Sequence, residues 1–139
     1  MKKIISFFSV LLIAITMTGC SSKGEEVKCT MDEDNEKGTM VATIKNDKVT
    51  KISVDSSQTY EDEDELNMAY TFSKMAISMV DEIDGMSASI KKNGKSLEIT
   101  MTMDLTKMSS EDIEDELGLE SFDKDGFIKY AEEEGYTCK

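Results

Sequence analysis

The 139-residue chain contains no histidine, and this absence removes the usual general base of enzymes that work near pH 7. It also lacks arginine, proline and tryptophan, and neither a Gly-x-Ser-x-Gly segment nor a phosphate-binding glycine loop occurs in it. No residue pattern marks a redox or group-transfer cofactor. The sequence therefore predicts a protein that is not an enzyme and that uses no cofactor.

Positive charge is scarce. Sixteen lysines stand against 29 acidic residues, which gives a formal net charge of −13. A surface of this sign repels the phosphates of nucleic acids and the anionic head groups of lipids. We therefore exclude nucleic acid as a partner, and we expect the charge to keep an acidic domain soluble and clear of a membrane surface.

Long apolar runs are absent except for one near the amino terminus. Lys2 and Lys3 precede an apolar run of twelve residues, 4–15 (IISFFSVLLIAI). A stable membrane-spanning helix needs about 20 residues, so this run is too short to cross a bilayer. A positive start followed by a short apolar core is typical of a signal peptide.

The segment Thr16-Met17-Thr18-Gly19-Cys20, which follows this run, resembles the lipobox of bacterial lipoproteins, although Met17 stands where that motif usually has Leu, Val or Ile. The resemblance implies cleavage after Gly19 and attachment of a diacylglyceryl group to Cys20. Two or more acyl chains, such as palmitate, anchor a protein stably at the extracytoplasmic face of the cell membrane. Without residues 1–19 the charge becomes −15, because two lysines are lost. The alternative is an ordinary secretory signal and an unmodified thiol.

Three cysteines are an odd number for an exported protein. If Cys20 carries lipid, Cys29 and Cys138 remain, each in a short extended stretch near one end of the folded part. A disulfide between them would close a loop of about 110 residues and stabilise the fold by up to ~4.7 kcal/mol. The alternative, a thiol metal site, lacks the four nitrogen or sulfur ligands that zinc prefers.

The sequence predicts a single folded domain after the signal peptide and tether. Residues 1–19 form the predicted signal peptide, 20–26 the lipidated amino terminus and a short tether, and 27–139 a single α+β domain. Alternating apolar residues predict strands, and three-and-four spacing predicts helices. The expected strands are 27–31, 39–45, 48–60, 86–92, 96–105 and 136–139; the expected helices are 61–83, 110–117 and 123–134; and 32–38 is expected to be a charged turn.

This order predicts a two-layer sandwich, in which an antiparallel sheet built from β-hairpins carries helices on one face. In the helix over 61–83, we expect Phe72, Met75 and Met79 to widen the buried stripe. In the strand over 96–105, polar residues alternate with apolar ones and form a hydroxyl-and-acid face. The candidate binding surface on this face is Thr100 and Thr102, flanked by Glu98 and Asp104.

The chain resembles the YehR-like lipoproteins, a group of small α+β lipoproteins. The resemblance is carried by a lipoprotein signal, by two β-hairpins each followed by a helix, and by the segments 99–105 (ITMTMDL) and 127–136 (FIKYAEEEGY). It implies the same fold and an anchored location, and it supplies no catalytic residue.

Two metal hypotheses arise from the residues. Segment 121–132 partly matches a calcium-binding EF-hand loop, with Asp123, Asp125 and Glu132 at ligand positions but Ser121 at the first. Capping of the last helix by one of its aspartates is the alternative, and we favour it. Thioethers bind Cu(I), but Met101, Met103 and the helical methionines fall where a core must lie.

Together these features predict a membrane-anchored extracytoplasmic lipoprotein with a non-enzymatic binding or interaction module. The partner would be a protein or a small molecule, and no metal is expected. The alternative is a weak calcium-binding lipoprotein that uses the acidic segment 121–132.

Overall fold

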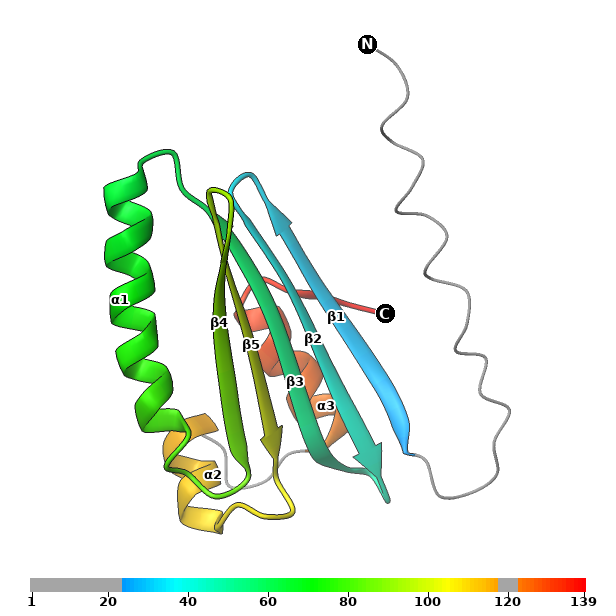
Figure 1. Cartoon of the computed structure of the whole chain (residues 1–139). Coiled ribbons are helices and arrows are strands. Elements are labelled where there is room, and N and C mark those ends of the chain that lie inside the picture. Colours follow the sequence, from blue (N-terminus) through cyan, green and yellow to red (C-terminus); the bar gives the residue numbers. More distant parts are fainter. Residues whose placement is uncertain (1–23, 118–122) are drawn as a thin grey trace.

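The computed structural model describes residues 24–117 and 123–139, which form six strands and three helices (Figure 1). The predicted α+β class is confirmed. In chain order the elements are β1 (Glu25–Glu33), β2 (Glu36–Lys45), β3 (Lys48–Thr59), α1 (Glu63–Val80), β4 (Met86–Asn93), β5 (Ser96–Asp104), α2 (Ser110–Leu117), α3 (Lys124–Glu133) and β6 (Thr137–Cys138).

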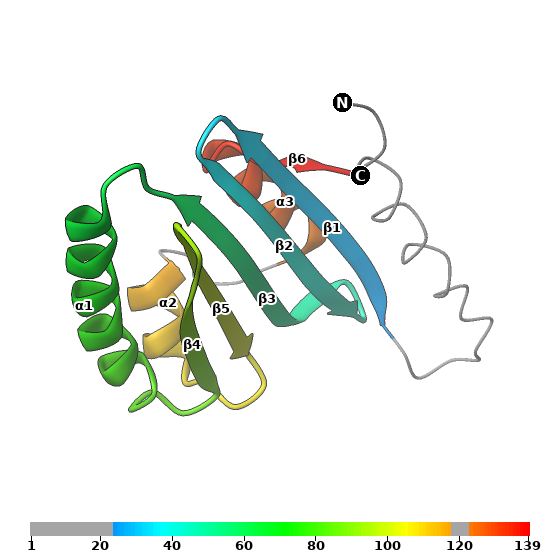
Figure 2. The ribbon, with the colours of Figure 1, turned by 45° about the horizontal axis from the view of Figure 1, so that its top comes forward.

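The strands form one antiparallel sheet in the order β4-β5-β3-β2-β1-β6 (Figure 2). β1, β2 and β3 follow one another as a meander, and α1 connects β3 to the β4–β5 hairpin. Asn46 and Asp47, between β2 and β3, have φ values of 51° and 64°. Two consecutive residues with positive φ are typical of a type I′ hairpin turn.

The first hairpin is longer than its sequence indicated. The turn predicted over 32–38 is present but shorter, because β1 continues to Glu33 and β2 begins at Glu36, which leaves only Asp34 and Asn35 between them. Asp32 and Lys37 face each other across the two strands and form an ion pair of 3.5 Å. Charged residues at the exposed end of a hairpin can thus pair as strands without an apolar side chain on either face.

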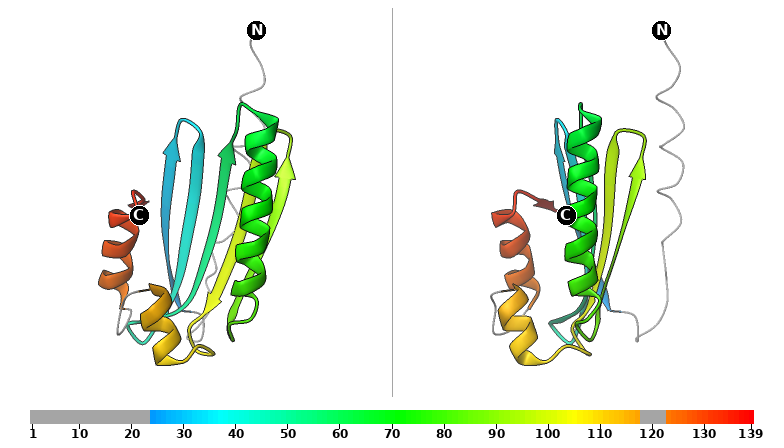
Figure 3. Two further views of the ribbon diagram at one scale, coloured as in Figure 1. Left: turned by 90° about the vertical axis from the view of Figure 1, so that its left-hand side faces the viewer. Right: turned by 60° about the vertical axis from the view of Figure 1, so that its left-hand side comes forward.

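The core lies under one face of the sheet, where alternate residues of every long strand are apolar. Phe127 and Ala131 of α3 are fully buried against it, as are Cys29 and Ala42 of the sheet. α3 contacts β1, β2, β3 and β6, whereas α1 contacts β4 and β5 (Figure 3). The strand register aligns the apolar residues of β2, β3, β5 and β4 with one another, so they all lie on this one face of the sheet.

The side of helix α1 that faces the sheet is narrower than expected: Leu66, Ala69, Tyr70, Ile77 and Val80 are buried or half-buried, as their spacing predicts. Asp62 caps the helix by accepting hydrogen bonds from the backbone N–H of Asp64 (2.7 Å) and Glu65 (3.2 Å), and Leu66 is buried. The prediction that three larger apolar side chains extend the buried stripe is wrong. Apolar residues occupy two opposite sides of this helix, and only one side can face β4 and β5. The exposed fractions are 66% for Phe72, 62% for Met75 and 68% for Met79.

The carboxyl terminus is fastened to the start of the domain by the Cys29–Cys138 disulfide, as the cysteine count predicted. β6 pairs with β1, and the Lys139 N–H donates a hydrogen bond of 3.0 Å to the carbonyl of Lys28. Cys29 has no exposed surface. A strand of two residues has few ladder hydrogen bonds of its own, and the covalent link adds to them in holding β6 in place.

Replacing both Cys29 and Cys138 by alanine should lower the free energy of unfolding by about 2–4 kcal/mol, because the cross-link restricts the unfolded chain. Urea unfolding of the oxidised protein measures the change. Wild-type protein treated with dithiothreitol serves as the control and should unfold like the variant. Equal midpoints for the oxidised wild type and the variant would contradict this role of the disulfide.

Gly38 of β2 lies directly under the ring of Tyr136, which is buried and whose hydroxyl pKa is raised by that burial. A Cβ at position 38 would stand 2.9 Å from both Cε1 and Cζ of Tyr136, and the hydroxyl oxygen would be closer still. No side chain fits there without displacing the ring. The glycine therefore allows the segment after α3 to pack against β2.

Gly38→Ala should destabilise the fold by about 1–3 kcal/mol, because it overpacks this contact. Adding Tyr136→Phe removes the hydroxyl and should recover part of the loss in a double-mutant cycle measured by urea unfolding. Gly94→Ala is the matched control, since Gly94 has a φ of +61° but no neighbour within 4 Å. It should destabilise through the backbone alone, with no response to Tyr136→Phe.

Candidate binding face

Two rows of polar side chains cross the face of the sheet opposite the core. The strand register places one residue from each of β1, β2, β3 and β5 in each row. The first row is Thr30, Thr39, Asp55 and Thr100, and the second row is Asp32, Lys37, Ser57 and Glu98. All eight side chains are exposed or half-buried.

These eight residues line an open hollow of about 530 Å³, which we call the hydroxyl–acid hollow. The hollow is also lined by Met31, Gly38, Ser56 and Ile99. Each of these lies between the first-row and the second-row residue of its own strand. Side chains alternate between the two faces of a strand, so these four contribute backbone to the floor. In Figure 1 the strands lie in front of α3, so the viewer looks obliquely onto this face.

Several contacts order the polar groups. Thr100 Oγ1 donates a hydrogen bond of 2.8 Å to Asp55 Oδ1, which joins β5 to β3 inside the first row. Asn93 Nδ2 donates one of 2.8 Å to Glu98 Oε1. Lys37 forms the ion pair with Asp32 described above. The hollow thus combines three carboxylates, one ammonium group and four hydroxyls, with an excess of negative charge.

Only two of the four residues that the sequence predicted as a binding surface lie at this hollow. Thr100 and Glu98 line it, whereas Thr102 and Asp104 do not. Asp104 Oδ1 instead accepts hydrogen bonds from Thr106, from its Oγ1 at 2.5 Å and its N–H at 3.1 Å. These bonds, with the Lys107 charge 3.7 Å away, hold the pKa of the Asp104 carboxyl below its usual range. Asp104 therefore fixes the turn after β5.

Sequence reasoning missed the lining residues that β1, β2 and β3 contribute. A signal existed for β3, because Ile52 and Val54 alternate with polar residues and so place Asp55 and Ser57 on the opposite face. The pairing of β3 with β5 could not be read in the same way, since the two strands are separated in the chain by α1 and β4. That pairing is what brings Asp55 to Thr100.

The three carboxylates of the calcium hypothesis are not brought together. Asp123 caps α3, and its Oδ1 accepts a hydrogen bond of 2.7 Å from the Gly126 N–H. Residues from Lys124 onward are therefore helical here, whereas in an EF-hand they would still belong to the calcium-binding loop. Asp123 and Glu132 are nine helical residues apart, about 13 Å along the axis. Ser121 lies outside the described residues, and residues 24–117 and 123–139 contain no group of three metal-ligating His, Cys, Asp or Glu side chains.

The methionines of the copper hypothesis are divided between two environments. Met103 is buried in the core and Met101 packs partly against it. Met75 and Met79 point to solvent from α1. Since α1 presents its other side to the sheet, the two pairs do not share a site.

The predicted signal peptide and the lipid attachment residue Cys20 lie outside the described residues. Within the described ranges, no helix has the length and apolar character needed to cross a membrane. The class that the fold and the site define is a small acidic α+β domain, with its core and its hydroxyl–acid hollow on opposite faces of a six-stranded antiparallel sheet.

Two uncharacterised lipoproteins of Listeria are similar to this chain in sequence. Lmo0207 of Listeria monocytogenes is 29% identical over 128 residues, and Lin0239 of Listeria innocua is 28% identical over 129 residues. Each match covers 87% of this chain and 80% of the relative. No family model matches the chain.

Two solved structures have a similar fold. The NMR structure of Escherichia coli YehR has a TM-score of 0.70 at 13% identity, and the match covers 86% of this chain and 93% of YehR. The NMR structure of a Streptococcus pneumoniae protein has a TM-score of 0.56 at 14% identity, with coverages of 91% and 92%. The predicted resemblance to YehR-like lipoproteins is confirmed by this agreement of lipoprotein relatives with a YehR-like fold.

Asp104→Asn should lower the free energy of unfolding by about 0.5–1 kcal/mol at pH 7, because the carboxylate is only partly buried. The hydrogen bonds from Thr106 lower the pKa of this carboxyl in the folded state, so the stabilisation is present above the ordinary pKa of an aspartate and disappears as the pH falls through the folded pKa. Urea unfolding at a series of pH values tests this. A difference between variant and wild type that does not shrink as the pH is lowered below the ordinary range of an aspartate would contradict it.

Proposed function

We propose that the chain is a lipoprotein anchored through Cys20 at the extracytoplasmic face of the membrane, and that its folded domain binds a ligand without catalysing a reaction. The lipobox-like segment before Cys20 and the lipoprotein relatives support the anchor. The hydroxyl–acid hollow supports the binding role. It is the observation on which the proposal depends, because eight polar side chains from four strands converge there in the open.

The chemistry of the hollow favours a ligand that carries amino or guanidinium groups. The three carboxylates of the hollow face the ammonium groups of Lys37 and of Lys91, whose Nζ lies 3.9 Å from Glu98 Oε2. One negative charge remains, and a cationic ligand would balance it. Carboxylate oxygens accept strong charge-assisted hydrogen bonds from such groups. The hydroxyls of Thr30, Thr39 and Ser57 add neutral donors and acceptors. The lining residues include no aromatic ring, so recognition would depend on polar contacts and not on stacking.

The position of the hollow relative to the tether suits capture of a ligand from outside. Cys20 precedes Gly24 by four residues, which span at most about 14 Å when extended. β1 begins at Glu25, where the described part of the chain starts, and runs to the β1–β2 turn at the opposite end of the sheet (Figure 1). The hollow meets β1 at Thr30 and Asp32, about 20 Å along the strand from its beginning. It is thus held at the end of the domain remote from the anchor point.

Asp55→Asn combined with Glu98→Gln should weaken binding of spermine at least tenfold, because it removes two of the three carboxylates of the hollow. Isothermal titration calorimetry of the mature lipoprotein in phosphatidylcholine nanodiscs measures the affinity, and circular dichroism checks the fold.

The matched control is Glu111→Gln with Asp115→Asn, which removes the same charge from the exposed side of α2. This control should bind spermine like the wild type. Equal weakening in both double variants would show that spermine responds to the overall charge of the protein and not to the hollow. Absence of spermine binding to the wild type would reject a cationic ligand of this kind.

A further inference from the structure

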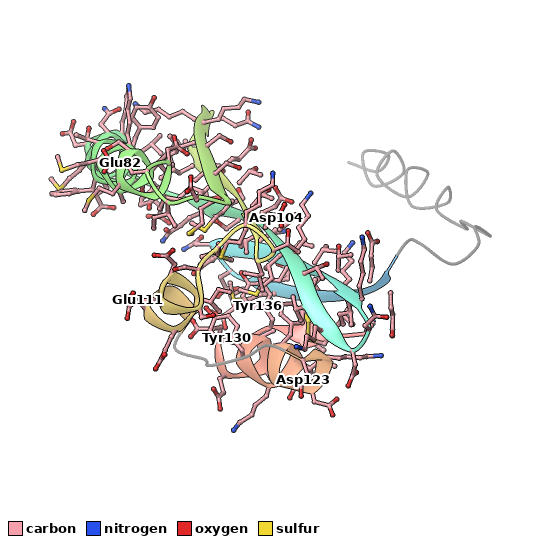
Figure 4. All side chains as sticks on the ribbon, turned by 90° about the horizontal axis from the view of Figure 1, so that it is seen from below. Glu82, Asp104, Glu111, Asp123, Tyr130 and Tyr136 are labelled. Atoms are coloured by element: carbon pink, nitrogen blue, oxygen red, sulfur yellow. A yellow bond between two sulfur atoms is a disulfide. The ribbon has the colours of Figure 1, made fainter. Side chains whose placement is uncertain are left out.

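The side of α1 that faces away from the sheet carries a continuous apolar stripe. Met68, Phe72, Met75 and Met79 are 62–68% exposed, and they are the large hydrophobic residues that the described part of the chain leaves most open to solvent. Figure 4 shows sulfur atoms on this outer side of the helix. We call these four residues the outer stripe. An exposed apolar patch of this kind on an otherwise acidic domain marks an interaction surface.

The spacing within the outer stripe indicates what kind of surface it fits. Successive members are four, three and four residues apart, which is the seam spacing of two packed helices. The residues beside the seam are small and uncharged, namely Ala69, Thr71, Ala76 and Ser78. A second helix can therefore approach α1 closely along about 16 Å, the length of three turns. Methionine side chains adapt to a partner surface, as they do in other helix-binding grooves.

A glutamate lies just beyond each end of the outer stripe. Glu65 precedes Met68 by three residues on α1, and Glu82 lies in the turn directly after the helix, three residues after Met79; both are exposed. Figure 4 shows Glu82 at the end of α1. Lys74, the one basic residue of α1, lies 6.0 Å from the ring centroid of Tyr70, away from the seam. The outer stripe is therefore apolar in the middle and negative at both ends.

We propose that the outer stripe is the docking site for an amphipathic helix of a partner protein that carries basic residues at both ends of its own apolar seam. Lysine or arginine side chains about 25 Å apart would meet Glu65 and Glu82. A second copy of this chain fits poorly, because glutamates would meet glutamates in either the parallel or the antiparallel orientation. This site is independent of the hydroxyl–acid hollow and lies on a different element.

The charge pattern makes a reciprocal test possible with a peptide probe. The probe is a helical peptide with leucines in the four-three-four spacing, a lysine three residues outside the stripe at each end, and one tryptophan. Its twin has glutamates in place of the two lysines. The protein contains no tryptophan, so the fluorescence reports only on the peptide. The protein is the mature lipoprotein in phosphatidylcholine nanodiscs.

The lysine peptide should bind the wild type at least tenfold more tightly than the glutamate peptide. Glu65→Lys with Glu82→Lys should reverse this preference. Phe72→Glu with Met75→Glu should abolish binding of both peptides, although it makes the protein more acidic. Ser87→Glu, an exposed control on β4, should bind like the wild type, as should the Asp55→Asn, Glu98→Gln variant of the hollow.

Three results would overturn the proposal. The first is equal binding of both peptides or no reversal by the lysine variant. The second is a dimer in analytical ultracentrifugation that Phe72→Glu with Met75→Glu dissolves, since a second copy would then occupy the stripe. The third is protection of the stripe by the phosphatidylcholine bilayer itself, detected as lipid contact of a label at position 72 in the absence of peptide.

Discussion

The alternation of side chains along the paired strands, interrupted by one register shift between β2 and β3 at Thr43 and Ile44, is the constraint on which this structure depends. Because the register aligns alternate residues across β1, β2, β3 and β5, one face collects the apolar side chains and the other collects hydroxyls and carboxylates. The same alignment creates the buried core and the hydroxyl–acid hollow. A shift of one residue in any of these strands would exchange the two faces and remove both.

Helices α3 and α1 contribute differently to the core face of the sheet. α3 supplies the fully buried Phe127 and Ala131 and makes the central contact with the sheet. α1 buries Leu66 over β4 and β5 but keeps a second apolar side exposed. A helix with two apolar sides stabilises the fold with one of them and leaves the other available for a partner. The larger contribution of α3 to the core permits α1 to serve both purposes.

Much of the fold could be predicted from local patterns. The Asn93-Gly94 turn, the alternation over residues 96–105 and the helix that ends before Gly135 are all visible in the sequence. The charged hairpin end at Asp32 and Lys37 was missed because ion pairing across strands leaves no apolar signal. The exposed side of α1 was missed because Phe72, Met75 and Met79 continue the apolar spacing around the helix, and spacing alone does not show where the buried stripe ends. The hollow needed the β3–β5 pairing, which depends on tertiary structure.

The position of β1 between β2 and β6 also has a mechanical consequence. One end of this strand continues into the predicted tether, and the other end contributes to the hollow, so tension between the membrane and a captured ligand would run lengthwise along β1. Nine paired residues join β1 to β2, and a covalent bond joins it to β6. Such a force would have to shear the whole ladder at once instead of peeling the strand away one residue at a time. The strand next to the predicted tether is therefore joined to its two neighbours by a long ladder on one side and a disulfide on the other.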